Sequence, residues 1–303
     1  MDSREEAREF LTSRRAKITP EQAGLPAGSR RRVPGLRRSE VAALADMSVE
    51  YYAKLERGNL AGVSPAVLEA LARALRLDDA ERAHLLNLTQ AADGTDALTR
   101  PRRRPAEGRW KPHRSLQWTL DAITAGPAFV RNGRMDILAA NRLARAFYSD
   151  VYATPGNQAN LARFNFLDPA SHRFYPDWDQ AADIAVAILR TEAGRNPHDK
   201  DLHDLVGELS TRSDEFRIRW GAHNVRHHGT GTKRFHHQAV GDLTLAYEGL
   251  EMAAEPGLTL TIYTAEPGSP SEESLRLLAS WAATPEIPGH RGGVHPIGSD
   301  ADR

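Results

Sequence analysis

The stretch RRVPGLRRSEVAALADMSVEYYAKLERG, residues 31–58, decides how the first part of this chain folds. Its middle portion spaces apolar residues so that one side of a short helix would be buried. These residues are Val41, Ala42, Leu44 and Ala45. A second helix is expected after a tight turn, because the Ser48 side chain can accept a hydrogen bond from a free amide at its start. Residues 36–58 therefore predict two short helices joined by a tight turn.

The second helix of this pair has one inward and one outward face. Tyr52 and Leu55 lie three residues apart and are predicted to face the core together with Met47. The positions left pointing outward are Val49, Glu50, Tyr51, Ala53, Lys54 and Arg57. This is the helix-turn-helix pattern, in which the second helix enters the major groove of DNA and its first residues meet base edges.

Charge is divided unevenly along a chain of 303 residues whose net charge is zero. Residues 1–115 carry 22 Lys and Arg against 16 Asp and Glu, and the remainder carries 18 against 24. A basic front half fits contact with a polyanion. There is no cysteine, which excludes disulfides and thiolate sites. The charged N-terminus and the lack of a long apolar run predict a cytoplasmic protein with no membrane partner.

The rest of the chain divides into further units. Ser64-Pro65 and the Asp78–Glu81 pair are helix-start signals, so residues 1–91 predict an all-α helix-turn-helix bundle. Residues 92–115 lack periodicity and contain RPRRRP, which predicts a basic, proline-rich linker, either a plain tether or an auxiliary phosphate contact. Residues 116–270 predict a sensor domain, and residues 271–303 a C-terminal helix and flexible tail.

The sequence after the linker is typical of an α+β domain with one antiparallel sheet. AFVRNGRMDILAAN predicts a hairpin at Asn132-Gly133, and two helical stretches occupy 177–194 and 198–213. Alternation in EFRIRWGAH predicts a strand over 215–223, followed by strands over 242–252 and 258–266. The GTGTK segment at 229–233 is interpreted as a hairpin turn.

These residues carry a family resemblance. VPGLRRSEVAALADMSVEYYAKLERG resembles the XRE-family helix-turn-helix, and more narrowly that of the MmyB-like transcription regulators. AFVRNGRMDILAANRLARAFY, RFNFLDP, ELSTRSDEFRIRW and GDLTLAYEGLE resemble the second domain of the same family. The resemblance covers residues 4–270. It implies a C-terminal PAS-like, ligand-sensing domain, which in this family is known with a fatty acid in its core.

The resemblance and the helix positions together assign DNA-contacting residues. Arg38 matches a family position that touches the DNA backbone, and a basic arm before it would neutralise phosphates. The arm consists of Arg30, Arg31, Arg32 and Arg37, with a solvated segment as the alternative. The other DNA-binding candidates are Ser48, Val49, Glu50, Tyr51, Lys54 and Arg57, although Arg57 could instead pair with Glu56. Asp46 occupies a turn position where the family usually has glycine, and aspartate tolerates the left-handed backbone better than most residues.

Ligand-binding candidates are taken from the predicted sheet. The wall would be formed by Phe216, Ile218 and Trp220, with Leu243, Leu245 and Tyr247 lining the same space. Arg219 or His223 could meet a ligand carboxylate.

The alternative of an enzyme or metal protein is weakly supported. Five histidines fall within fifteen residues: His223, His227, His228, His236 and His237. Adjacent strand residues point to opposite faces, so each His-His pair gives at most one inward ligand, and no HExxH spacing is present. We therefore expect no enzyme, cofactor or metal, but a homodimeric regulator that binds double-stranded DNA and is gated by a fatty-acid-like ligand. A constitutive regulator whose second domain only dimerises or docks a partner remains the alternative.

Overall fold

The amino-terminal helices form a bundle around one apolar core in the computed structural model, which describes residues 3–26, 35–93, 110–197, 199–222 and 229–283. The helices are α1 (Ser3–Lys17), α2 (Arg38–Leu44), α3 (Val49–Glu56), α4 (Pro65–Ala74) and α5 (Asp79–Asp93). Tyr52 and Leu55 are fully buried in this core. Helix α4 begins as expected, because Ser64 accepts a hydrogen bond from the amide of Val67 and Pro65 occupies the first turn.

The turn between α2 and α3 follows the predicted geometry. Asp46 has φ of 51°, the left-handed conformation that glycine adopts most easily. The Ser48 hydroxyl accepts from the amide of Tyr51 at 3.0 Å and begins α3. One detail differs: Val41, Ala42 and Ala45 are buried, but Leu44 is 37% exposed and does not belong to the buried face.

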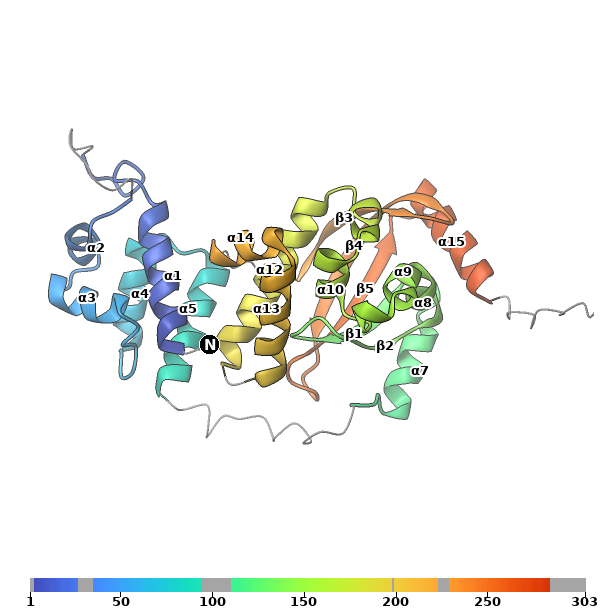
Figure 1. The fold of residues 1–303 in the computed structure, drawn as a ribbon, viewed down its shortest axis with the longest axis horizontal. Helices are drawn as coiled ribbons and strands as arrows, with labels where there is room; N and C mark the ends of the chain where they lie inside the picture. Colours follow the sequence, from blue (N-terminus) through green and yellow to red (C-terminus); the bar gives the residue numbers. More distant parts are fainter. Residues whose placement is uncertain (1–2, 27–34, 94–109, 198, 223–228, 284–303) are drawn as a thin grey trace, which may run out of the picture.

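The second domain is a five-stranded antiparallel sheet with helices on both faces, in the described part of the chain. Strand order is β2-β1-β5-β4-β3. The strands are β1 (Ala128–Asn132), β2 (Ile137–Ala140), β3 (Thr230–His237), β4 (Gly241–Glu251) and β5 (Leu258–Ala265). Helix α7 (Arg114–Ala122) covers one face through Leu116 and Leu120. All other helices of the domain lie on the opposite side or at the edges (Figure 1).

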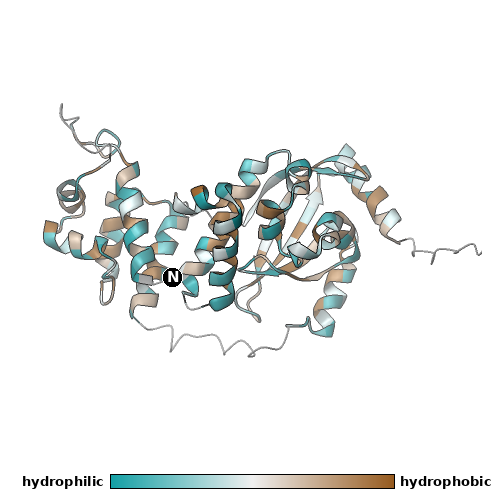
Figure 2. Cartoon of the chain, in the orientation of Figure 1, coloured by the Kyte–Doolittle hydropathy of each residue, from teal (hydrophilic) through white to brown (hydrophobic). Residues whose placement is uncertain are grey.

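The inner face of the sheet meets a helical layer rich in aromatic side chains. The layer consists of α8 (Arg142–Phe147), α9 (Ser149–Ala153), η1 (Pro155–Asn157), α10 (Leu161–Leu167), α11 (Ala170–Phe174), α12 (Trp178–Arg195), α13 (Lys200–Arg212) and α14 (Asp214–Gly221). The Asn141 side chain begins α8 by accepting from the amide of Ala144 at 2.7 Å. Phe147 packs edge-on against Phe174 and Phe235, so helices and sheet share one core. The hydropathy colouring shows apolar residues interspersed with polar ones along these helices and along the strands (Figure 2).

Two predictions for the elements of this domain are wrong. The segment predicted as a strand over 215–223 begins with helix α14, capped by the Ser213 hydroxyl, which accepts from Phe216. Phe216 and Trp220 are four residues apart, so they share a helix face as well as the face of a strand. The GTGTK segment at 229–233 is not a turn, because Thr230 begins β3 and pairs with Glu248 of β4. The turn lies at 238–240 instead.

The predicted C-terminal helix is present as α15 (Pro270–Ala283), which packs on β4 and α8. Residues 284–303 lie outside the described residues, as does most of the predicted linker. Arg114 and Ser115, placed in that linker by the sequence, already belong to α7. Within the described residues, no helix is long and apolar enough to cross a membrane.

Candidate nucleic-acid interface and ligand-binding core

Helix α3 presents a polar outer face beside its buried one. Ser48, Glu50, Lys54 and Arg57 are exposed, and Val49 is 41% exposed although it is apolar. Tyr51 is half-buried and packs partly against the core. An exposed row at the start of a short second helix is the geometry with which helix-turn-helix proteins reach base edges.

A buried carboxylate fixes this helix to its neighbours. Glu56 is buried and accepts hydrogen bonds from Arg15 of α1 and Arg38 of α2. Burial alone would raise the pKa of Glu56, but these two hydrogen bonds lower it below the usual range. The predicted alternative pair of Glu56 with Arg57 is therefore wrong, since Glu56 turns to the core side. The sequence did not reveal this role for Arg15.

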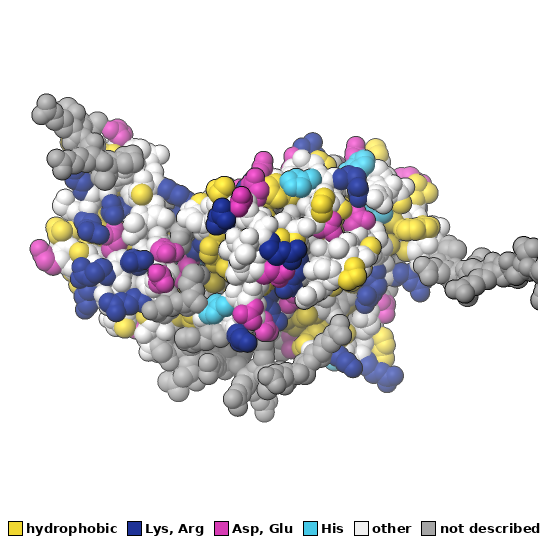
Figure 3. Space-filling model, in the orientation of Figure 1, with side chains coloured by type: hydrophobic (Ala, Val, Ile, Leu, Met, Phe, Trp, Pro, Cys, Tyr) yellow, Lys and Arg dark blue, Asp and Glu magenta, His cyan; other side chains and the backbone are white. Residues whose placement is uncertain are grey.

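The Arg38 side chain contacts Glu56 but lies mostly in solvent. Its side chain is 57% exposed although its Nε donates to Glu56. Arg37 is exposed immediately before it, whereas Arg30, Arg31 and Arg32 lie outside the described residues. Basic side chains gather over the part of the molecule formed by α2, α3 and α4 (Figure 3). The Arg38 guanidinium is thus held beside α3 by its contact with Glu56.

The ligand-binding candidates separate into buried and exposed groups. Leu243, Leu245 and Tyr247 lie on the inner face of the sheet, and Phe216 is buried in the same core. Ile218 is 67% exposed, because it points away from the helix face shared by Phe216 and Trp220. Arg219 pairs with Asp179, Asp183 and Glu215, so its charge is already engaged. His223 lies outside the described residues.

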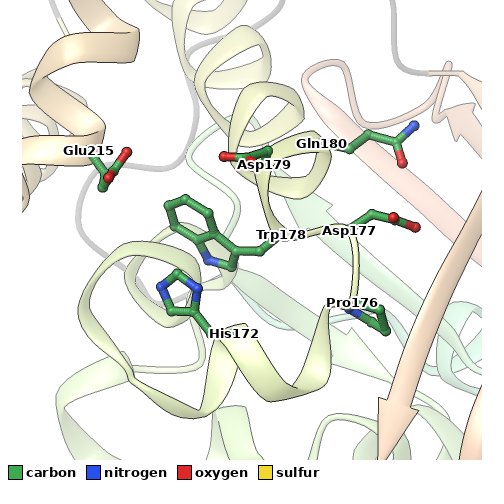
Figure 4. A pocket seen from close by; sticks show the side chains of 7 residues that line it. All are labelled: His172, Pro176, Asp177, Trp178, Asp179, Gln180 and Glu215. Carbon is green, nitrogen blue, oxygen red and sulfur yellow. The ribbon is translucent and has the colours of Figure 1, made fainter.

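A surface pocket of about 590 Å³ opens at the ends of α11, α12 and α14 (Figure 4). It is lined by His172, Pro176, Asp177, Trp178, Asp179, Gln180 and Glu215. His172 stacks on one side of Trp178, and the Arg219 guanidinium lies 5.1 Å from the same ring. Arg219 and Arg234 engage its carboxylates. The pocket is polar and includes none of the predicted ligand residues.

The two domains meet through a buried ion pair. Arg190 of α12 is completely buried, and its Nη1 donates to Oε1 of Glu6 on α1. The other amino group of Arg190 donates to the carbonyl of Trp220, and the guanidinium lies 4.1 Å from the centre of that indole ring. Trp220 stacks on Phe216, which belongs to the sensor core. A continuous set of contacts therefore joins the helix-turn-helix bundle to the interior of the second domain.

Helix α5 completes this boundary with His84. The His84 ring is buried 3.7 Å from the Glu6 carboxylate, and its nitrogens make no hydrogen bond in the described residues. Burial lowers the pKa of His84, so the ring is neutral in the docked structure. A β-carbon at Gly194 of α12 would come within 2.8 Å of the ring, so only glycine allows this approach.

The histidine cluster does not form a metal site among the residues that the structure covers. His236 is exposed and pairs with Asp242 at 2.6 Å, while His237 is buried and stacks on Phe147. The two neighbours point to opposite faces, as predicted. No group of three or more His, Asp or Glu side chains in the described ranges is arranged to hold a metal ion.

A helix-turn-helix bundle joined to a sheet domain with an enclosed aromatic core defines a DNA-binding transcription regulator with a ligand-binding domain. Residues 4–85 match the family described as helix-turn-helix domain, and residues 112–278 match the MmyB-like transcription regulator ligand binding domain. The chain therefore belongs to the MmyB-like regulators, which confirms this part of the resemblance, while the XRE assignment and the PAS-like description stay predictions. Both matched families are regulatory rather than enzymatic. No curated protein matches the chain closely enough to count as a relative.

Proposed function

We propose that this chain is a sequence-specific regulator whose DNA affinity is gated by an apolar, fatty-acid-like ligand in the core of the second domain. The observation that carries the gating proposal is the buried contact of Glu6 and Arg190 with Trp220. A ligand that shifts α14 would move Trp220 and so change the docking of the bundle. Gating requires the ligand to bind the DNA-competent and incompetent states with different affinity.

On DNA, the roles follow from exposure on α2 and α3. Arg38 and Arg37 are the backbone contacts, together with the arm before them. Glu50 and Lys54 are the direct readers, since glutamate accepts from cytosine and lysine donates to guanine, and Val49, Tyr51 and Ser48 complete the reading surface. Because one helix reads few base pairs, the chain would bind as a homodimer to half-sites about one helical turn apart.

The test is DNA binding of the full chain with and without hexadecanoate. Footprinting on the genomic DNA that flanks the gene locates the site, and anisotropy titrations on that site follow. We expect affinity to fall steeply from about 50 to 200 mM salt. Arg38→Ala should weaken binding to all DNA sequences alike, whereas Lys54→Ala should change which DNA sequence is preferred. Lys200→Ala, an exposed lysine of α13, is the matched control. An affinity that hexadecanoate leaves unchanged would refute gating.

A second candidate is a constitutive regulator whose second domain serves only to dimerise or dock a partner. Exposed apolar side chains favour it: Leu277 and Trp281 lie four residues apart on α15, and both are more than half exposed. Light scattering of the wild type and of Leu277→Ser/Trp281→Ser would separate the two candidates. Loss of the dimer together with an unchanged ligand response would assign this face to dimerisation alone.

A further inference from the structure

Val49 is an apolar side chain left in solvent at the start of helix α3. It is 41% exposed, and it is not among the described side chains that form the core of the bundle. It also adds little to the helix, because β-branched residues lose side-chain freedom there and the helix dipole favours an acidic residue in the first turn. Neither packing nor helix stability therefore accounts for a valine at this position.

The residues around Val49 hold it in a fixed position. Immediately before it, the Ser48 hydroxyl accepts from the amide of Tyr51 at 3.0 Å and anchors the first turn of α3. Three residues after it, Tyr52 is fully buried in the core of the bundle. A valine in a helix has one strongly preferred side-chain conformation. Its two methyl groups are thus presented to solvent as a rigid apolar surface.

This apolar surface lies beside polar side chains on the outer face of α3. Ala53 is four residues after Val49 and shares its side of the helix, where it is half-buried. Glu50 and Lys54 are also four residues apart and form the exposed polar row next to it. One face of α3 therefore presents a hydrogen-bond acceptor, a hydrogen-bond donor and an apolar group together.

The surroundings of this face suit a negatively charged partner. Arg37 and Arg38 are exposed at the start of α2, and Arg57 is exposed at the end of α3. Under the proposed function, that partner is duplex DNA with α3 in its major groove. Among the base edges in that groove, the 5-methyl group of thymine is the apolar feature, and the other groups are hydrogen-bond donors or acceptors. An exposed valine in this position is therefore complementary to a thymine methyl group.

We propose that Val49 packs against the 5-methyl group of a pyrimidine in the major groove and so makes the chain select thymine at one position of its site. The inference rests on the proposed function for placing α3 in the groove, and it adds the identity of one base. 5-Methylcytosine carries its methyl group on the same ring carbon as thymine. The same contact therefore makes DNA binding sensitive to cytosine methylation at that position. Removing one methyl group from water corresponds to about a fourfold difference in affinity.

The test replaces each thymine of the footprinted site in turn by deoxyuridine, which keeps every hydrogen-bonding group and lacks only the 5-methyl group. Fluorescence anisotropy measures the affinity of the full chain for each duplex. In the wild type, at least one replacement should weaken binding about fourfold. At that position Val49→Ser should bind the thymine and deoxyuridine duplexes equally. Val49→Thr keeps one methyl group and should still prefer thymine.

Cytosine methylation gives a second measurement at the same position. With a C·G pair there, the wild type should bind the 5-methylcytosine duplex about fourfold more tightly than the cytosine duplex. Val49→Ser should bind the two duplexes equally. Because each comparison adds or removes only a methyl group, differences in hydrogen bonding between the bases do not enter it.

The matched control is Leu44→Ser, which removes a similarly exposed apolar side chain from α2 and should leave the preference for thymine unchanged. A footprinted site in which no thymine shows the preference, or a preference that Val49→Ser retains, would overturn the inference and leave the proposed function standing. The absence of any footprint would overturn both. Light scattering of Val49→Ser completes the test, since a lost oligomer together with an unchanged preference would assign Val49 to a protein contact and overturn the inference.

Discussion

Replacing Arg190 by methionine tests the contact between the domains most directly. Arg190 is fully buried with Glu6, so the substitution removes the cation that donates to a buried carboxylate. Removal of one partner of such a pair costs about 3–5 kcal/mol. Loss of the stacking on Trp220 adds about 0.5–2 kcal/mol. We expect Arg190→Met to lose at least about 3 kcal/mol of docking free energy and Glu6→Met to lose a similar amount.

The double variant Glu6→Met/Arg190→Met gives the sharper result. Well-packed apolar residues often replace a buried ion pair at little cost, so the double variant should be more stable than the sum of the single losses predicts. Chemical denaturation, followed by tryptophan fluorescence and by far-ultraviolet circular dichroism, measures the free energy of unfolding of the three variants. In the single variants the unfolding transitions recorded by the two probes should no longer coincide, because undocked domains unfold independently.

The matched control is Arg195→Met on the same helix. Arg195 pairs with Glu251 at the surface, where both side chains are largely in solvent. Such a pair contributes less than about 1 kcal/mol. If Arg190→Met were as mild as Arg195→Met, or if the double variant lost the full sum of the single losses, the interface would not be coupled through this pair and the reasoning would be refuted.

Three further predictions concern the turn and two titrating groups. Asp46→Gly should raise the unfolding free energy by about 1 kcal/mol, since glycine adopts φ of 51° without strain; an unchanged denaturation midpoint would contradict this. The pKa of Lys233 is lowered to about 7, so the folded state binds fewer protons than the unfolded state above that pH, and stability should rise between about pH 7 and 10.5. Lys233→Met should flatten this rise in denaturant titrations. Burial, together with the charges of Arg190 and Arg14, lowers the pKa of His84 and outweighs Glu6, which raises it. Stability present above about pH 6.5 should therefore be lost on acidification, and His84→Leu should reduce that loss.

The helix-turn-helix could be predicted from the sequence because its signals are local. Ser48 caps α3 within three residues, and Tyr52 and Leu55 are buried as their spacing predicts. The left-handed turn at Asp46 also follows from a single position. Which residues read DNA stays a prediction, because spacing places a side chain on a helix face but does not show what it contacts.

The sequence of helix α14 predicts a strand because its apolar residues fit the period of a strand as well as that of a helix. Phe216 and Trp220 share a face in a helix and in a strand, and only Ile218 distinguishes the two, since it is inward in a strand and exposed in the helix. The stronger signal was the helix start, where Ser213 caps the amide of Phe216. A helix-start signal of this kind is stronger evidence than an alternation that fits both periods.

Which charged residues meet across the fold is harder to predict than which helices and strands form. Glu6 stands in the first turn of α1, where an acidic residue needs no explanation beyond the helix dipole, yet it meets Arg190, 184 positions away. Arg131 has a sequence signal that alternation conceals. Strand β1 is covered by α7 on one face and by the aromatic layer on the other, so it has no face in solvent. A charged residue in a strand covered on both faces must be buried, so the burial of Arg131 follows from the position of β1 between two layers.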